Sequence, residues 1–121
     1  MSMRGFTAEA LLKLPVKVRG IQLGWPVDMI LDADGRRALG LDVLCGDDSH
    51  RFLPLAAAEV RPDSIEVGSA LTLLTDVELE FYRGRGSTLR ELRTRRRLRD
   101  VAFGDGWQIE ELLAEEPAPA A

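Results

Sequence analysis

The sequence of 121 residues contains only one cysteine, Cys45, and only one histidine, His50. A single cysteine excludes an internal disulfide framework and fits a reducing compartment. One cysteine and one histidine also supply too few ligands for a structural zinc site. We therefore expect a fold that needs neither a disulfide nor a metal, and we assign no metal-binding, cofactor-binding or catalytic residue.

Long hydrophobic runs are missing as well. No apolar stretch approaches the roughly 20 residues that a helix needs to span a bilayer, and the first residues contain no signal-peptide core. The sequence therefore predicts a cytoplasmic protein without a membrane span. The apolar content of 45% with 30% charged residues is typical of a globular protein.

Basic residues are fewer than acidic ones, at 16 against 20, and many of them lie in one stretch. The net charge of −4 and the isoelectric point of about 5.0 argue against a generic nucleic-acid binder with a basic surface. Arginine accounts for 14 of the 16 basic residues, and six of these lie between Arg90 and Arg99. Acidic residues collect at 78–80 and 110–116, so the last third of the chain is strongly patterned in charge.

The stretch Pro26–Leu55 predicts three consecutive strands of one sheet. Asp34 and Gly35 suit a two-residue type I′ hairpin turn, because both tolerate positive φ. A second break at residues 46–49 precedes the run Arg51–Leu55, whose Pro54 suits an edge strand or a strand end.

Further short elements flank these strands. We expect a helix at 6–12 with Thr7 as its N-cap, a strand at 16–19, a turn at 19–24 and a helical turn at 56–60. Strands are expected at 65–67 and 70–74. Five or six short strands in a chain of this size predict a small antiparallel β-barrel or a strongly curled sheet.

The order of these elements resembles the PRC-barrel family. The resemblance lies in the helix cap, the Leu-Pro-Val strand at 14–16, the Gly-Ile-Gln-Leu-Gly turn at 20–24, the Asp34-Gly35 hairpin and the Phe-Leu-Pro-Leu run at 52–55. The family is named for the photosynthetic reaction centre H subunit and includes a domain of a bacterial ribosome maturation factor. It implies a compact β-barrel from Thr7 to about Leu74 that docks onto other macromolecules without chemistry of its own.

After Leu74 the chain changes character. Thr75 and Glu78 form a capping box that predicts a helix at 76–83, although the alternation of apolar and acidic residues there also fits a strand. A second capping box at 88–91 predicts another helix. Strands are then expected at 98–103 and 107–113, joined at Asp105-Gly106.

The two Asp-Gly turns suggest a truncated internal repeat, and they define the expected domains. The preferred register matches Asp34-Gly35 with Asp105-Gly106, and a competing register matches residues 42–47 with residues 100–105. We expect a PRC-barrel-like domain at 1–75, a helical connector with an incomplete second hairpin unit at 76–116, and a disordered tail at 117–121. The fold class is thus all-β with short helices.

Four aspartates and the Cys45–His50 pair are the candidates for chemistry. Asp32, Asp34, Asp47 and Asp48 lie in adjacent loops, but aspartate is a common turn former and no glutamate follows at EF-hand spacing. Cys45 and His50 have no third group to orient them. We therefore interpret the aspartates as turn residues and expect a protein that is not an enzyme.

The expected function is non-catalytic docking onto a protein partner. The candidate interaction surface comprises Arg90, Arg93, Arg95, Arg96, Arg97, Arg99, Phe103, Trp107 and Ile109. RNA or ribosome contact through the arginine run is the alternative, although nearby acidic residues can pair with the arginines and no aromatic residue is interleaved for base stacking. A small-molecule-binding barrel also stays open.

The apolar second hairpin raises the question of oligomeric state. Two strands alone are marginal in water, so these apolar side chains need a partner surface. That surface is either the open side of the same barrel or the matching unit of a second copy, and we expect a homodimer built around Trp107.

Overall fold

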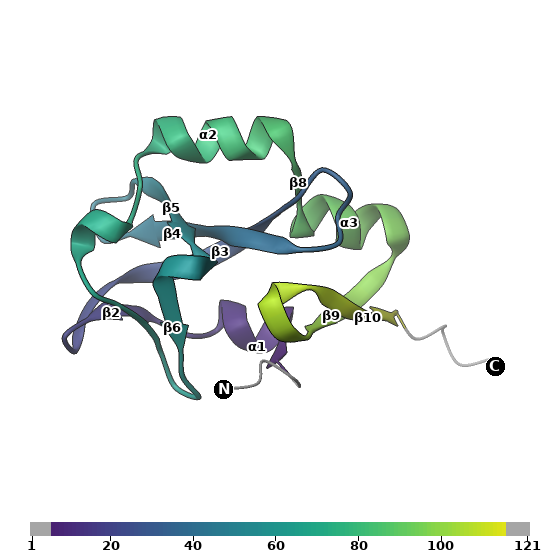
Figure 1. The fold of residues 1–121 in the computed structure, drawn as a ribbon, viewed down its shortest axis with the longest axis horizontal. Coiled ribbons are helices and arrows are strands. Elements are labelled where there is room, and N and C mark those ends of the chain that lie inside the picture. Colours follow the sequence, from purple (N-terminus) through teal and green to yellow (C-terminus); the bar gives the residue numbers. More distant parts are fainter. Residues whose placement is uncertain (1–5, 116–121) are drawn as a thin grey trace.

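The computed structural model describes residues 6–115, whose strands form two sheets (Figure 1). The large sheet contains β2 (Val16–Val18), β3 (Ile21–Leu31), β4 (Ala38–Cys45), β5 (His50–Pro54), β6 (Ala58–Val60), β7 (Ile65–Val67) and β8 (Ser87–Thr88). The small sheet contains β1 (Phe6–Thr7), β9 (Leu98–Phe103) and β10 (Ile109–Ala114). The helices are α1 (Ala8–Leu12), α2 (Asp76–Arg85) and α3 (Leu89–Arg96), with 3₁₀ turns η1 (Leu55–Ala57), η2 (Ala70–Thr72) and η3 (Asp105–Trp107). The expected all-β class is confirmed only as a mainly β fold, with 47% strand and 29% helix.

The large sheet is curled and forms half of a barrel. Its strand order is β5-β4-β3-β2-β7-β6, with β8 alongside the end of β3. The expectation of a purely antiparallel sheet is wrong, because β2 and β7 pair in parallel, with Val16 opposite Ile65. Parallel pairing needs a long crossover, which here runs through β3, β4, β5 and β6.

The hairpin turns differ in length from the sequence expectation. Gly35 has the positive φ of 67° that favours glycine, but it lies in a longer loop that the Asp32 amide closes by donating to the Arg37 carbonyl at 2.9 Å. The two-residue hairpin turn is found instead at Arg19-Gly20, where both residues have positive φ. Residues 21–24 therefore belong to β3 and not to a turn.

The helices follow the capping signals closely. Thr7 caps α1 by accepting a hydrogen bond from the Ala10 amide at 3.2 Å, and α2 is a helix as its capping box predicts. Thr75, however, hydrogen bonds to the Glu78 side chain and makes no side-chain bond to the backbone of α2.

Two short segments were assigned incorrectly. The helical turn predicted at 56–60 is η1 followed by β6, so it is shifted by one residue and shortened. The strand predicted at 70–74 is wrong, because Ser69 caps the 3₁₀ turn η2 by accepting from the Leu71 amide.

The main hydrophobic core unites the N-terminal and C-terminal parts of the chain. Leu11, Met29 and Leu41 share it with Val101 and Phe103 of β9. The second hairpin therefore packs within the same chain, and β1 pairs with β9 at the register Phe6 to Phe103. Ile30, Phe52 and Leu79 form a smaller core beneath α2. The predicted tail at 117–121 lies outside the described residues. Within the described range no helix is long and apolar enough to cross a membrane.

Candidate docking surface

Helix α3 carries four of the nine residues of the predicted surface, and β8 fixes its starting point. Thr88 pairs with Ile30 of β3 and its hydroxyl accepts from the Glu91 amide at 3.1 Å, which caps the helix. Gly86 passes so close to β3 that a Cβ atom would lie 2.1 Å from the Leu31 carbonyl oxygen. Only glycine fits this approach, so the position of α3 on the sheet depends on it.

The inner face of α3 is apolar and its outer face is charged. Leu89 and Leu92 are buried in the main core at 2% and 4% exposure. Arg90, Glu91 and Arg95 lie on the exposed side. This amphipathic division directs part of the arginine run to solvent.

Arg93 has a structural role, so part of its guanidinium group is already occupied and cannot bind a ligand. Its Nε donates to the Leu98 carbonyl at 3.4 Å, and its Nη2 donates to the Arg99 carbonyl. Arg97 ends α3 in the left-handed region with φ of 51°. Arg93 therefore ties the end of the helix to the beginning of β9.

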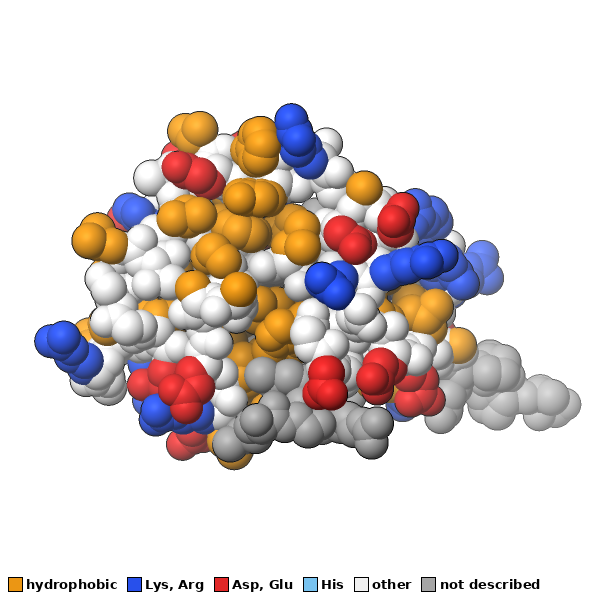
Figure 2. Space-filling model, viewed as in Figure 1, with side chains coloured by type: hydrophobic (Ala, Val, Ile, Leu, Met, Phe, Trp, Pro, Cys, Tyr) orange, Lys and Arg blue, Asp and Glu red, His pale blue; other side chains and the backbone are white. Residues whose placement is uncertain are grey.

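The other five arginines of the run are exposed, and we call them the arginine surface. They are Arg90, Arg95, Arg96, Arg97 and Arg99. None of them forms a salt bridge with another described residue. Figure 2 shows Lys and Arg side chains gathered over the α3 side of the molecule.

The acidic residues expected to neutralise this run are used elsewhere. Glu91 accepts a hydrogen bond from the Thr88 hydroxyl at 3.1 Å. Asp100 is buried and accepts from the amides of Glu9 and Val101 at 3.0 and 2.8 Å. The expected pairing of these two residues with the arginines is therefore not formed.

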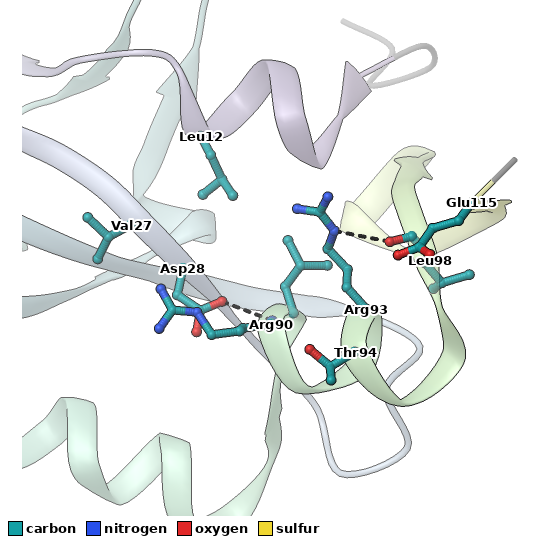
Figure 3. A pocket seen from close by; sticks show the side chains of 9 residues that line it. Leu12, Val27, Asp28, Arg90, Arg93, Thr94, Leu98 and Glu115 are labelled. Atoms are coloured by element: carbon teal, nitrogen blue, oxygen red, sulfur yellow. Dashed lines mark hydrogen bonds between the residues drawn. The ribbon is translucent and has the colours of Figure 1, made fainter. Parts of the chain in front are cut away.

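A pocket of about 350 Å³ lies beside the arginine surface, between α1, β3 and α3 (Figure 3). Its polar floor is Asp28, whose Oδ1 accepts from the Met29 amide at 2.8 Å and from the Arg90 amide at 3.2 Å. Burial raises the pKa of Asp28, and the two amide hydrogen bonds and the charge of Arg90 partly oppose this. The lining residues are Leu12, Val27, Asp28, Leu89, Arg90, Arg93, Thr94, Leu98 and Glu115.

The apolar members of the predicted surface lie elsewhere. Phe103 and Trp107 are buried at 1% and 7% exposure and contact each other with ring centroids 5.8 Å apart. Ile109 is partly buried, and its amide donates to the Arg36 carbonyl. The structure does not bring these three residues to an exposed face with the arginines, because their hydrophobic side chains complete the main core.

Sequence reasoning missed a network of charged residues around Asp42. This carboxylate is 4% exposed, and it contacts His50 Nδ1 and Arg83 Nη2, each at 2.8 Å. Arg83 also binds Glu80 at 2.7 Å. The network connects β4, β5 and α2. The only sign of this network in the sequence is an aspartate placed within the apolar run of β4.

The remaining candidates for chemistry act as turn residues. Asp32 accepts from the Arg36 amide at 2.8 Å, and Asp47 accepts from the Ser49 amide at 3.0 Å. Burial raises the pKa of the Cys45 thiol, which disfavours a reactive thiolate. Residues 6–115 contain no group of three or more potential metal ligands.

Comparison with known proteins finds no matching family model, no similar curated protein and no similar solved structure. The PRC-barrel resemblance therefore rests on the residues quoted for it alone.

Proposed function

We propose that this chain is a non-catalytic docking module of the PRC-barrel kind that holds an acidic segment of a partner protein on its arginine surface. The proposal rests chiefly on one observation. Five guanidinium groups gather at α3 and the start of β9 without forming a salt bridge in the described part of the chain. Guanidinium groups bind carboxylates through paired hydrogen bonds.

Part of this arginine run also has a role in stability. Arg93, Arg95 and Arg96 occupy the last turn of α3, where positive charge is favoured by the helix dipole. This role needs one or two cations near the last carbonyls. It gives no reason for Arg99 on β9. Arg90 in the first turn is accounted for in part by the Asp28 carboxyl, whose pKa its charge lowers. The run as a whole still carries more positive charge than the helix end requires.

An acidic protein segment fits this surface better than RNA does. Base stacking needs exposed aromatic rings, and the two aromatic residues of the predicted surface, Phe103 and Trp107, are buried. RNA contact through phosphates alone is the second candidate, supported by the same arginines.

The test compares two probes on matched variants. Fluorescence anisotropy would measure binding of labelled poly-glutamate and of single-stranded RNA, each of about 20 units, at two salt concentrations. We expect poly-glutamate to bind more tightly than RNA at equal salt. The double variant Arg95→Gln with Arg96→Gln should weaken its binding by about tenfold.

The control removes the same charge from another place. Arg36 and Arg37 are exposed in the β3–β4 loop, and the variant Arg36→Gln with Arg37→Gln should bind poly-glutamate as the parent does. Equal losses in both variants would show a nonspecific charge effect and contradict the proposal. Tighter RNA binding that the α3 variant alone weakens would favour the second candidate instead.

A further inference from the structure

A stripe of exposed residues on α2 lies opposite the side that packs on the sheet. Leu79 faces the sheet at 1% exposure, whereas Val77 and Phe81 are 73% and 52% exposed. Gly84 continues the same face at the next turn, because positions 77, 81 and 84 follow the helical repeat. Nothing described lies within 4 Å of the position that a Gly84 Cβ would occupy.

The two ends of α2 carry opposite charges. Asp76 and Glu78 lie in its first turn, and Arg83 and Arg85 lie in its last turn. The Arg85 guanidinium lies 4.7 Å from the centroid of the Phe81 ring, so it borders the exposed stripe. Figure 2 shows hydrophobic side chains both on α2 and directly below it, so the stripe continues onto the neighbouring surface.

We propose that this face of α2 docks against the same face of a second copy, with the two helices antiparallel about a two-fold axis. Such an arrangement places the acidic end of each helix beside the basic end of the other. When Val77 faces Gly84 of the second copy, Glu78 lies on the same flank of the interface as Arg85 of that copy. The two-fold axis repeats both contacts, as an isologous interface requires.

Gly84 has a specific part in this arrangement. Glycine within a helix is less stabilising than alanine, and Gly84 has no close contact of its own to justify it. In the dimer it provides a notch for Val77 of the second copy. The dimer is weak, because a helix of 10 residues buries less than the about 800 Å² per partner of a standard interface. We expect a Kd of about 100 μM.

Sedimentation velocity from about 10 μM to 1 mM tests the proposal, a range that brackets the expected Kd. The average mass of the parent should rise above 13.4 kDa with concentration. Phe81→Ser should weaken the association by about tenfold or more, since it removes a central aromatic contact. Leu112→Ser, which changes a 41% exposed residue on β10, should leave the association unchanged. A parent of 13.4 kDa throughout, or a Phe81→Ser variant that associates like the parent, would overturn the proposal.

Two further variants distinguish this register from general hydrophobic association. Gly84→Ala should raise the melting temperature of the monomer and yet weaken the dimer, because the new methyl group fills the notch. Glu78→Arg and Arg85→Glu should each weaken the dimer, and the double variant should restore it. Stronger association of Gly84→Ala, or no recovery in the double variant, would contradict the register. The α3 variants of the preceding subsection leave this face intact, so the two proposals fail independently.

Discussion

Buried and half-buried carboxylates connect elements that are distant in the sequence. Asp28 links β3 to the first turn of α3, Asp42 links β4 to β5 and α2, and Asp100 links β9 to α1. In each case the oxygen atoms accept hydrogen bonds from amides or from charged side chains. These contacts offset the cost of burying a charge, and they fix how the helices lie on the sheets.

The pKa of Asp28 predicts how its replacement affects stability. Because burial raises the folded-state pKa above the ordinary value of 3.8, the ionised carboxylate costs stability above that raised pKa, and this cost disappears as the pH falls through it. Asp28→Asn keeps an acceptor for both amides but carries no charge. We therefore expect the variant to be at least as stable as the parent at pH 7, with the difference shrinking toward pH 4.

Urea denaturation at pH 7 and pH 4 measures this difference in stability. Asp47 provides the control, because its pKa is shifted in the opposite direction. Hydrogen bonds from Ser49 lower the pKa of Asp47, so Asp47→Asn should lose a little stability at pH 7 and recover relative to the parent as the pH falls. An Asp28→Asn variant that is destabilised equally at both pH values would show that packing, and not charge, decides the effect.

The sequence identified aspartates in turns but not those with structural roles in the interior. Asp32 and Asp47 lie among glycine and other turn residues, which makes their local role visible. Asp42 lies between Leu41 and Val43, and its partner Arg83 is 41 positions away. Local patterns contain no information on which distant cation meets a buried acid, so this network could not be predicted.

At the scale of elements, two threonines precede helices in similar capping-box sequences but make different contacts. The Thr88 hydroxyl accepts from the Glu91 amide of α3, whereas the Thr75 hydroxyl bonds to the Glu78 side chain and to no backbone amide of α2. We expect Thr88→Ala to lower the free energy of unfolding by about 1 kcal/mol. Thr75→Ala should cost roughly half of that or less, because no backbone amide loses its partner.

Chemical denaturation of the two variants gives the comparison directly. Thr88 is 5% exposed, so Thr88→Ser serves as a control that keeps the hydroxyl and loses only a methyl group. A Thr75→Ala variant as unstable as Thr88→Ala would contradict the capping difference seen between α2 and α3.

Helix positions were predicted more accurately than strand pairings. Capping residues act within four positions of one another, so α1, α2 and α3 could be located from the sequence. Strands of three residues, such as β6, have too little alternation to be recognised. The parallel pairing of β2 with β7 depends on the path of the whole crossover and has no local signal.

For the whole molecule, the shared core tests the domain boundary that the sequence suggests near residue 75. A chain ending there lacks Leu89, Val101, Phe103 and Trp107, all of which are buried in the main core. We expect residues 1–75 alone to give the poorly dispersed amide spectrum of an unfolded chain. Loss of several large core side chains costs more than the usual stability of about 5–15 kcal/mol.

A chain ending at residue 115 is the matched control, because it retains every described contact. Nuclear magnetic resonance spectra of the two chains would show the difference. A well-dispersed spectrum of residues 1–75 would contradict our expectation and would support an independent barrel domain.

The contact of α1 with β9 also determines when folding can finish during synthesis. The Glu9 amide bonds to Asp100, 91 positions later in the chain. At roughly 5–20 residues per second, the N-terminal segment waits on the order of 5–20 seconds for β9 to be made. During this interval the part of the apolar side of α1 that packs on β9 stays uncovered, whereas β3 is already made and can cover the rest. The growing chain, more than the finished fold, is then the form most exposed to chaperones and proteases.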